Sequence, residues 1–260
     1  MFRHQWDQIR LINDNQTIKN QHQCRRSIES DPIEKQFRIA GFVPLSTVDW
    51  PDQLAAVIFT QGCPWRCGYC HNSHLIPPCG ETSIEWETVL NEITKRKNFL
   101  DGVVISGGEP LLQRGIVNVL QQIRALGLKT GLHTGGSLPK QLKSVLPLTD
   151  WVGLDIKATP YNYSDVTHRA KSGQVAWESL DLVIKSGADY EVRVTVHPQL
   201  MSVSSFEILL NQLVDKKVKH IRLQSAREPF LDKNLKLCSF NEHQHIFNQH
   251  KHEFVSALWR

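Results

Sequence analysis

Residues 61–72 read Gln-Gly-Cys-Pro-Trp-Arg-Cys-Gly-Tyr-Cys-His-Asn and directly follow the apolar run from Ala55 to Thr60. This stretch places three thiols, those of Cys63, Cys67 and Cys70, within eight residues. The cysteines are separated by three and then by two residues, in a loop that contains glycine and proline, so their sulfurs can turn toward one common centre. Such spacing is typical of metal ligands, and the rest of the chain is interpreted around it.

The number of cysteines indicates which kind of metal centre to expect. No second cysteine pair follows that would complete an ordinary structural zinc site. A four-iron cluster is normally held by four thiolates, so a cluster held by three keeps one iron open to another ligand. Cys79 and Cys238 are solitary; Cys79 as a fourth ligand would close the open position, and the two cannot hold a further cluster. The sequence therefore predicts one cluster with an open iron.

Composition limits the class of protein. The chain has 260 residues and a mass of 29.8 kDa, enough for one α/β domain with a sizeable core. A net charge of +4 without dense basic blocks argues against a nucleic-acid partner. No apolar run reaches the ~18 residues that span a bilayer, and residues 1–20 are too polar for a signal peptide, so no membrane partner and a cytoplasmic location are expected. Clustered cysteines fit a reducing compartment.

The chain divides by composition into two parts. Residues 1–38 are polar and show no helical or strand periodicity, so we expect an N-terminal extension. Cys24 lies in this part, where a lone cysteine is more often incidental than a ligand. Residues 39–260 are expected to form the main domain.

Short β-rich runs alternate with helical patterns in the main domain. The expected strands are Ala55–Thr60, Gly102–Ser106, Lys129–His133, Trp151–Asp155, Tyr190–His197 and Val218–Gln224. The expected helices are Ser83–Phe99, Leu111–Leu126, Leu138–Leu146, Val175–Ser186 and Ser204–Val214. This alternation predicts parallel strands with right-handed crossovers. Six such units suit a partial (β/α)6 TIM-like barrel, of the α/β class, better than a closed eight-stranded one.

Polar and small residues follow these strands, and the carboxyl ends of parallel strands share one edge of a sheet. They are the three cysteines after the first strand, Gly107, Gly108 and Glu109 after the second, Thr134 after the third, Asp155 and Lys157 at the fourth, and His197 after the fifth. Two glycines let backbone approach a ligand closely, and a carboxylate behind them can meet an ammonium group. The Asp155–Lys157 pair also fits a simple ion pair that caps a strand, and His197 also fits a buried structural histidine.

The cysteine spacing, with Tyr69 just before Cys70, resembles the cluster loop of the radical S-adenosylmethionine enzymes. The longer run from Gly41 through Thr47-Val48-Asp49-Trp50-Pro51 to the cysteines is similar to the activating proteins of glycyl-radical enzymes. Within these, it most resembles the activating proteins of anaerobic ribonucleotide reductase. The resemblance covers about Ile39 to Arg227, and it implies that residues 39–260 form a partial-barrel domain of this superfamily.

The resemblance implies cofactors and roles. Cys63, Cys67 and Cys70 would hold a [4Fe-4S] cluster, whose open iron binds the amino and carboxylate groups of S-adenosylmethionine; one electron then cleaves it to methionine and a deoxyadenosyl radical. The Gly107, Gly108, Glu109 motif would contact the amino end of the methionine. Lys157, oriented by Asp155, would contact the carboxylate, and His197 would contact the adenosine. Thr134 would also meet the cofactor, and Tyr69, His71 and Asn72 would adjust the cluster. No further catalytic residue is implied.

Three features depart from the resembled family. His133 stands where relatives tend to carry an acidic residue, and Asp52 follows Pro51 where glycine is common. The C-terminal stretch Asn241–Leu258 predicts an amphipathic helix that packs through Ile246, Phe247, Phe254 and Leu258. Its four histidines, His243, His245, His250 and His252, are expected on a solvated face rather than around zinc.

The leading functional hypothesis is an activase that abstracts a hydrogen from a glycine Cα of a partner enzyme. The resemblance implies anaerobic ribonucleoside-triphosphate reductase as this partner, and a flavodoxin or ferredoxin as the electron donor. One alternative keeps the cofactors but acts on a small molecule, as the 7-carboxy-7-deazaguanine synthase of queuosine biosynthesis does. Another is a non-catalytic protein that uses the cysteines for a structural metal, which leaves the Gly-Gly-Glu-Pro stretch unexplained.

Overall fold

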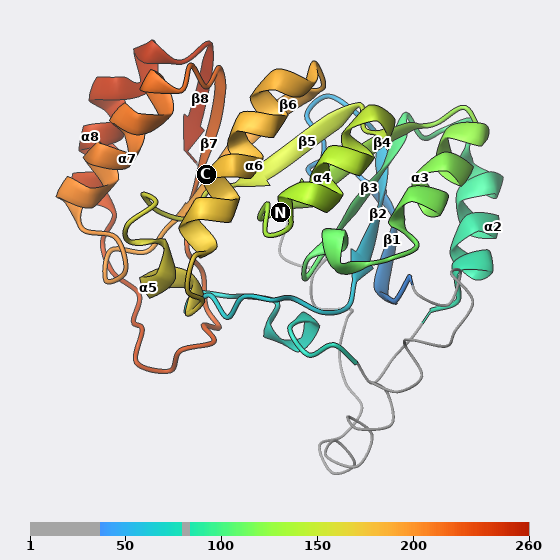
Figure 1. Ribbon diagram of the computed structural model, residues 1–260, viewed down its shortest axis with the longest axis horizontal. Helices are drawn as coiled ribbons and strands as arrows, with labels where there is room; N and C mark the ends of the chain where they lie inside the picture. Colours follow the sequence, from blue (N-terminus) through green and yellow to red (C-terminus); the bar gives the residue numbers. More distant parts are fainter. Residues whose placement is uncertain (1–36, 80–83, 260) are drawn as a thin grey trace.

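The computed structural model describes residues 37–79 and 84–259 (Figure 1). Its centre is one sheet whose eight strands lie side by side in the order of the chain. The strands are β1 (Ile39–Ser46), β2 (Ala55–Thr60), β3 (Gly102–Gly107), β4 (Lys129–Thr134), β5 (Trp151–Asp155), β6 (Asp189–Val196), β7 (His220–Ser225) and β8 (Ser256–Trp259). β1 runs antiparallel to β2, and every later pair is parallel.

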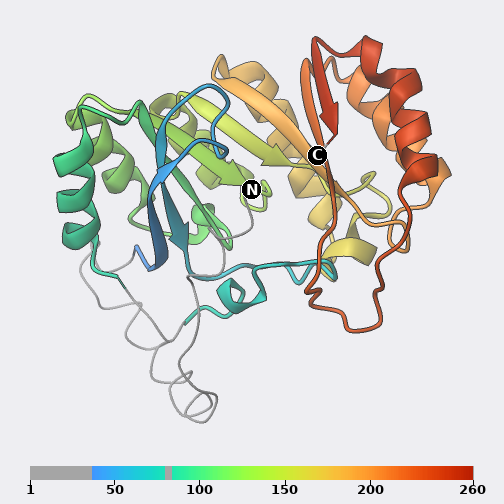
Figure 2. The ribbon, with the colours of Figure 1, turned by 180° about the vertical axis from the view of Figure 1, so that it is seen from behind.

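Helices connect the parallel strands. The α-helices are α2 (Trp86–Arg96), α3 (Ile116–Ala125), α4 (Pro139–Val145), α5 (Tyr163–Thr167), α6 (Ser172–Ser186), α7 (Val203–Asp215) and α8 (Asn241–His250). Short 3-10 turns are η2 (Ser73–Leu75), η3 (Pro110–Leu112), η4 (Leu146–Leu148) and η5 (Lys251–Glu253). The long helices cover one face of a curved, open sheet, whose strands are seen from the opposite side in Figure 2. This is the partial-barrel architecture that the sequence predicts.

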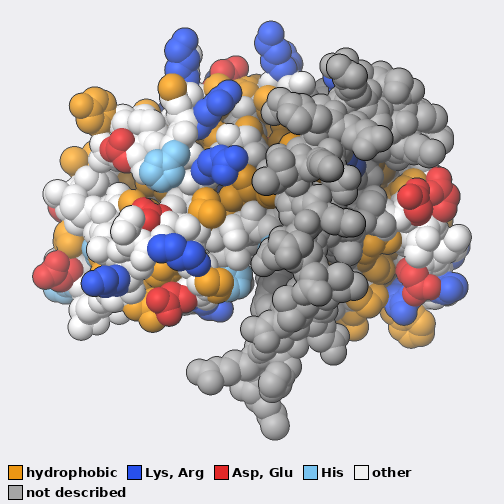
Figure 3. Space-filling model, turned by 90° about the horizontal axis from the view of Figure 1, so that it is seen from below, with side chains coloured by type: hydrophobic (Ala, Val, Ile, Leu, Met, Phe, Trp, Pro, Cys, Tyr) orange, Lys and Arg blue, Asp and Glu red, His pale blue; other side chains and the backbone are white. Residues whose placement is uncertain are grey.

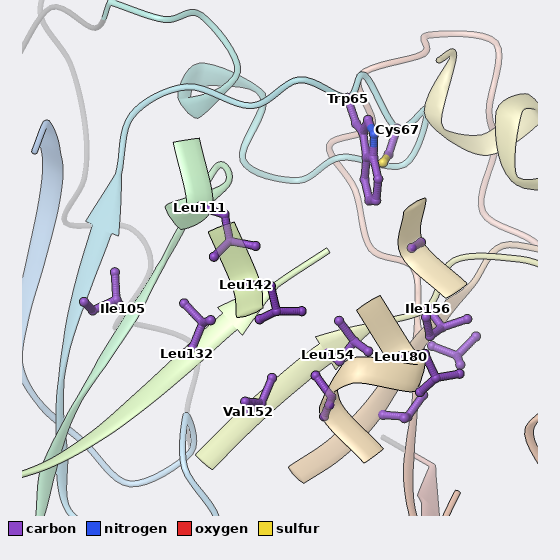
Figure 4. Packing of buried hydrophobic residues seen from close by; sticks show 14 of the residues in the cluster. Trp65, Cys67, Ile105, Leu111, Leu132, Leu142, Val152, Leu154, Ile156 and Leu180 are labelled. Atoms are coloured by element: carbon purple, nitrogen blue, oxygen red, sulfur yellow. The ribbon is translucent and has the colours of Figure 1, made fainter. Parts of the chain in front are cut away.

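The core lies between the sheet and the helices. Every residue of β2 is buried, as expected for a parallel strand that is covered on both faces. Side chains from alternate strand positions, such as Ile105, Leu132 and Leu154, pack against helix residues that include Leu142 and Leu180 (Figure 4).

A second apolar cluster fills the inner face near the amino ends of the strands. Trp50, in the segment between β1 and β2, stacks on Trp151 with ring centroids 5.6 Å apart. A Cβ added to Gly102 or Gly131 would lie 2.8 Å or 2.9 Å from the Trp50 ring, so only glycine leaves room for that ring. The segment 47–54 thus closes this end of the sheet and leaves the carboxyl ends of the strands for a site.

All six expected strands are present, with boundaries shifted by at most two residues. The five expected helices are also present; α2, α3 and α4 are shorter than expected, and α6 and α7 are longer. The sequence did not predict β1, β8 or the short helix α5. The expected helix Asn241–Leu258 is wrong beyond His250, because Ser256–Trp259 forms β8 on the free edge of β7. Leu258 is 49% exposed and does not pack inward, whereas Phe247 and Phe254 are buried as expected.

His243 is also placed differently from the prediction. It is buried, and its Nε2 lies 2.8 Å from the carbonyl oxygen of Met201. His245 and His252 are exposed, as expected for a solvated face. The amphipathic pattern predicted the position of the helix, but it did not predict which of its histidines are buried and which are exposed.

Residues 1–36, including Cys24, lie outside the described residues. Phe37 and Arg38, the last two residues of the expected extension, pack on the main fold: the Phe37 ring meets the Trp86 ring edge-on at 6.0 Å, and the Arg38 N–H donates to Gln113 Oε1. The division at residue 38 otherwise stays a prediction. None of the described helices is both long and apolar enough to cross a bilayer.

Candidate functional site

The cysteine loop is anchored at its start to the end of the neighbouring strand. The Gly62 carbonyl accepts a hydrogen bond from Glu109 N at 2.8 Å, and the Thr60 carbonyl accepts one from Gly108 N at 3.0 Å. The Gln113 side chain donates to the Gln61 carbonyl at 2.7 Å. The start of the loop, and with it Cys63, is therefore held in place by the Gly-Gly-Glu stretch after β3.

The far part of the loop is anchored to the other half of the sheet. Arg66 N and Gly68 N donate to the carbonyls of Thr167 and Val166 in α5, at 3.0 Å and 3.2 Å, and Asp232 N donates to the Gly68 carbonyl at 2.9 Å. The loop therefore runs from β2 across the carboxyl edge of the sheet to α5, below the strands in Figures 1 and 2.

The three cysteines lie in this crossing segment. Cys67 is buried and Cys63 and Cys70 are half-buried, all with free thiols. Burial raises the pKa of Cys63 to about 12 and also raises those of Cys67 and Cys70, while the backbone N–H groups of Trp65 and Asn72 hydrogen-bond to the Cys63 and Cys70 sulfurs. Among residues 37–79 and 84–259, no three His, Cys, Asp or Glu side chains converge on a single-ion position. Ligands of a cluster surround several irons, so they do not need to converge in that way.

Glu109 ties the second and third strand ends together. Its Oε1 accepts from Thr134 Oγ1 at 2.6 Å and from Leu111 N at 3.1 Å, and its Oε2 accepts from Gly135 N at 3.2 Å. Gly136 N in turn donates to Thr134 Oγ1. Burial raises the pKa of Glu109, and these hydrogen bonds oppose that rise. Thr134 and Glu109, predicted as separate cofactor contacts, thus form one hydrogen-bonded unit.

The close packing of the protein's own backbone requires glycine at positions 107 and 108. Gly107 has φ +120, and a Cβ there would lie 2.2 Å from Thr60 N. A Cβ on Gly108 would lie 2.3 Å from the Gly62 carbonyl oxygen. The close backbone approach that glycine allows is therefore made to β2 and to the start of the cysteine loop, and it positions that loop.

Lys157 lies beside the cysteine loop. Its Nζ is 3.2 Å from Asp155 Oδ2 and 6.0 Å from the centroid of the Trp65 ring, and its side chain is only 12% exposed. Burial alone would lower the pKa of Lys157, but the charge of Asp155 and the nearby Tyr69 and Cys67 hold it well above its ordinary value. Asp155 and Lys157 are therefore paired, as predicted, and the ammonium is close to the cysteines.

The residues next to Cys70 differ in burial. Tyr69 is buried, and its hydroxyl has no hydrogen-bond partner among residues 37–79 and 84–259. His71 is exposed and Asn72 half-buried. A buried hydroxyl without a partner is uncommon in folded proteins and suits a position that a bound group completes. Of the three, Tyr69 therefore faces the interior of the site.

His197, after β6, is also buried with an unused polar atom. Its Nδ1 accepts a hydrogen bond from Gln199 N at 3.3 Å, and its ring meets Phe230 edge-on at 4.9 Å. Its Nε2 has no partner in the part of the chain that the structure describes. Burial lowers the pKa of His197, so the ring is neutral near pH 7. Because Nδ1 is the acceptor, Nε2 carries the proton and is a free donor.

The structure also shows site residues that sequence reasoning missed. The ring of Trp65 is buried and meets Tyr163 edge-on at 5.6 Å, and a Cβ on Gly135 would lie 2.5 Å from that ring. Tyr163 OH donates to the Asp155 carbonyl. Figure 4 shows Trp65 and Cys67 extending from the loop toward the core. The position of Trp65 between Cys63 and Cys67 is the sequence feature that could have indicated a role for this residue in the site.

His133 lies away from this site. Its Nε2 is 2.8 Å from the carbonyl oxygen of Asp49, and its ring meets Trp151 edge-on at 5.4 Å. The residue that departs from the resembled family therefore contacts the segment 47–54 on the inner face of the sheet, whereas the neighbouring Thr134 contacts Glu109.

The family model of the radical SAM superfamily matches residues 57–224, which is more than half of the chain. These residues span β2 to β7 and include the cysteine loop. The chain belongs to the radical SAM superfamily. It is therefore a radical SAM enzyme rather than a structural metal-binding protein, and its cofactors are a [4Fe-4S] cluster and S-adenosylmethionine.

Curated relatives carry related names. The chain is 29% identical over 184 residues to a putative glycyl-radical enzyme activating enzyme of Methanocaldococcus jannaschii, covering 68% of this chain and 75% of that protein. It is 33% identical over 142 residues to a pyruvate formate-lyase-activating enzyme of Clostridium pasteurianum, covering 52% of this chain and 59% of that one. A Staphylococcus aureus enzyme of the same name is 36% identical over 128 residues, covering 44% and 50%.

Solved structures share the fold at low identity. Streptococcus suis SuiB bound to S-adenosylmethionine superposes with a TM-score of 0.60 at 16% identity, over 78% of this chain and 49% of that one. The enzyme anSMEcpe with bound AdoMet and a peptide gives 0.61 at 14% identity, over 76% and 60%.

The residues present fit the cofactors. Three free thiols lie on one loop, a buried ammonium lies beside them, and two buried polar atoms, Tyr69 OH and His197 Nε2, have no partner within the described residues. These are the donors that a cluster and a ligand with carboxylate, amine and adenosine groups would use.

Proposed function

We propose that this radical SAM enzyme is the activase of a glycyl-radical enzyme, with anaerobic ribonucleoside-triphosphate reductase as its partner. The names of the relatives support the activase class. The resemblance of residues 41–72 to the activating proteins of that reductase supports the choice of partner. Cluster and cofactor, when bound, supply one electron and the radical that removes the hydrogen from the glycine Cα.

The observation that carries the proposal is the cysteine loop, bonded at one end to the Gly-Gly-Glu stretch and at the other to α5. In this proposal Cys63, Cys67 and Cys70 hold the cluster, and Lys157 binds the cofactor carboxylate through its charge. Gly107, Gly108 and Glu109, backed by Thr134, line the amino end of the cofactor.

The remaining residues orient the cofactor and limit water. Asp155 holds Lys157, and Tyr69 OH and His197 Nε2 offer donors to polar atoms of the cofactor. The rings of Trp65 and Phe230 cover the lysine and the histidine, so that charged contacts operate in a partly dry site, where they are stronger. His71 and Asn72 flank the cluster. A flavodoxin or ferredoxin would supply the electron.

The test uses anaerobically reconstituted enzyme reduced with dithionite. Its electron paramagnetic resonance signal should change when S-adenosylmethionine is added, and methionine should form. A glycyl-radical signal should then develop on added anaerobic ribonucleotide reductase. A signal on pyruvate formate-lyase alone would reassign the partner, whereas cofactor cleavage driven only by a small substrate such as the deazaguanine precursor would refute the activase class.

A further inference from the structure

The outer side of the cysteine loop carries a basic surface. Three segments form it: residues 62–72, residues 163–172 with α5, and residues 226–240 after β7. Together they contain six Lys or Arg residues and three Asp or Glu residues. All six basic side chains are exposed, and we call the surface that they form the basic face: Arg66, Arg169, Lys171, Arg227, Lys233 and Lys236.

The three segments are joined by hydrogen bonds. The loop donates to α5 through Arg66 N and Gly68 N, and Asp232 N donates to the Gly68 carbonyl. A Cβ on Gly68 would also lie 3.3 Å from Leu235 Cδ1. Figure 3 shows Lys and Arg side chains spread over the part of this side that the grey atoms leave visible. The basic face is therefore a single surface built around the cysteines.

The charges of the basic face are not neutralised within the described residues. None of the six pairs with a described carboxylate, whereas the exposed Lys216 and Arg124 elsewhere pair with Asp181 and Asp150. Unpaired surface charge acts over about a Debye length, ~8 Å at physiological salt, and accelerates encounters with an oppositely charged partner.

Apolar side chains lie in or next to the same segments. Leu237 is 60% exposed, and Tyr161, just before α5, is 92% exposed. Exposed aromatic and aliphatic groups among charged ones are typical of a protein interface. This combination favours a protein partner with an acidic surface over a nucleic acid.

The two sides of the cysteine loop face different directions. Trp65 and Cys67 are buried and extend toward the core (Figure 4). Glu109 is also buried, and the side chain of Lys157 is only 12% exposed. Arg66, between Trp65 and Cys67 in sequence, is exposed. A target glycine has to reach the cofactor on the inner side, so the outer side remains for delivery of the electron.

We propose that the basic face docks an acidic one-electron carrier protein, which reduces the cluster through the outer side of the loop. The carrier loses one electron and the oxidised cluster gains it; no proton or group is transferred. The proposal rests on the proposed function, since it requires a cluster on Cys63, Cys67 and Cys70.

The test compares two triple variants of the full chain. Arg169→Glu/Lys233→Glu/Lys236→Glu reverses the charge of the basic face outside the cysteine loop. Lys97→Glu/Lys185→Glu/Lys219→Glu reverses three exposed charges that lie toward the amino ends of the strands. Cluster reduction is followed by stopped-flow absorbance, with reduced flavodoxin or with dithionite, at low and high salt.

The first variant should lose about tenfold or more of the flavodoxin-driven rate at low salt, and the salt dependence with it, because steering contributes 10 to 10³-fold to such rates. Its dithionite rate, and the control variant, should match the wild type. Equal flavodoxin rates in all three proteins would overturn the proposal, as would a matching loss with dithionite or a loss confined to glycyl-radical transfer. If the reconstituted wild-type enzyme contains no cluster that dithionite can reduce, the proposed function fails instead.

Discussion

Lys157 is the residue whose charge matters most for the proposed cofactor site. It is buried beside Trp65 and Cys67, and Asp155 keeps it protonated. Replacing it removes a charge-assisted hydrogen bond, which is worth about 1.5–3 kcal/mol. Lys157→Met should therefore weaken S-adenosylmethionine binding by about 10- to 100-fold while the cluster still assembles.

The measurement is a titration of the reduced cluster signal with S-adenosylmethionine. Lys140→Met, an exposed change on α4, is the matched control and should bind like the wild type. A half-saturation point that is the same in Lys157→Met as in the wild type would remove Lys157 from the carboxylate role.

His133 provides a test of pH dependence away from the site. Burial, and then the charge of Arg193, hold its pKa well below the ordinary value, so the ring stays neutral in the folded protein. The unfolded chain binds a proton there below about pH 6.5, and the folded chain does not. The free energy of unfolding should therefore fall as pH drops from 7 toward 5.

This contribution can reach about 1.4 kcal/mol per pH unit for one proton. His133→Gln keeps a donor for the Asp49 carbonyl but cannot be protonated, so its unfolding free energy should depend less on pH. Urea unfolding at several pH values measures the slope, with the exposed His245→Gln as control. If both variants follow the wild-type slope, His133 does not titrate on unfolding.

At this scale the sequence predicted that Glu109, Thr134 and Lys157 lie near the cysteine loop, because residues at the ends of parallel strands share one edge. It did not predict what each contacts. Gly107 and Gly108 were expected to face a ligand, yet their lack of a Cβ accommodates the backbone of Thr60 and Gly62. Such contacts join segments about 45 residues apart, and local pattern carries no information about them.

At the scale of elements, the cysteine loop and the Gly-Gly-Glu stretch act as one unit. A Cβ on Gly108 would lie 2.3 Å from the Gly62 carbonyl oxygen, and backbone cannot move aside as a side chain can. Gly108→Ala should therefore displace the loop and sharply reduce cluster assembly, measured as iron bound per chain. Gly68→Ala should keep its cluster, because its Cβ would meet side chains rather than backbone, with the Leu235 Cδ1 nearest at 3.3 Å. Full iron content in Gly108→Ala would show that cluster assembly does not depend on the contact between the cysteine loop and the Gly-Gly-Glu stretch.

The edge strand β8 is the element that the sequence missed at the C-terminus. Its Trp259 contacts the rings of Phe206, Phe240 and Phe247 at 5.9–6.3 Å and donates to Ser225 Oγ. Trp259→Ala should lower the free energy of unfolding by about 2 kcal/mol, as loss of a largely packed aromatic side chain does. Urea unfolding tests this, with Val255→Ala, at an exposed position, as control. A loss of unfolding free energy no larger than that of the control would show that β8 contributes little to stability.

The helix pattern failed there for a physical reason. Apolar residues at helical spacing continue past His250, but the open edge of β7 offers unpaired backbone groups that a strand satisfies and a helix does not. Similarly, β1 is antiparallel and precedes the βα alternation, so the pattern that revealed six units did not include it. Tertiary pairing decided both cases.

At the scale of the whole molecule, the sequence predicted an open, parallel barrel with one mouth, and the order of eight adjacent strands agrees with it. The interior polar groups, such as Glu109 and Lys157, contact other residues of the fold and carry no information about a particular protein partner. The charge of the outer surface is spread over segments far apart in sequence, so it indicates a class of partner only once the fold brings those segments together.

The number of clusters is also a property of the whole chain. Reconstituted protein should contain about four iron and four sulfide atoms per chain, since one cluster requires that stoichiometry. Cys67→Ala should abolish this content and leave the far-UV circular dichroism nearly unchanged, because the sheet and its helices pack independently of one thiol. Cys238→Ala, at a free thiol in the chain after β7, should retain the wild-type iron content. About eight iron atoms in the wild type, or a loss in Cys238→Ala comparable to that in Cys67→Ala, would require a second cluster and overturn the assignment of one open site to three cysteines.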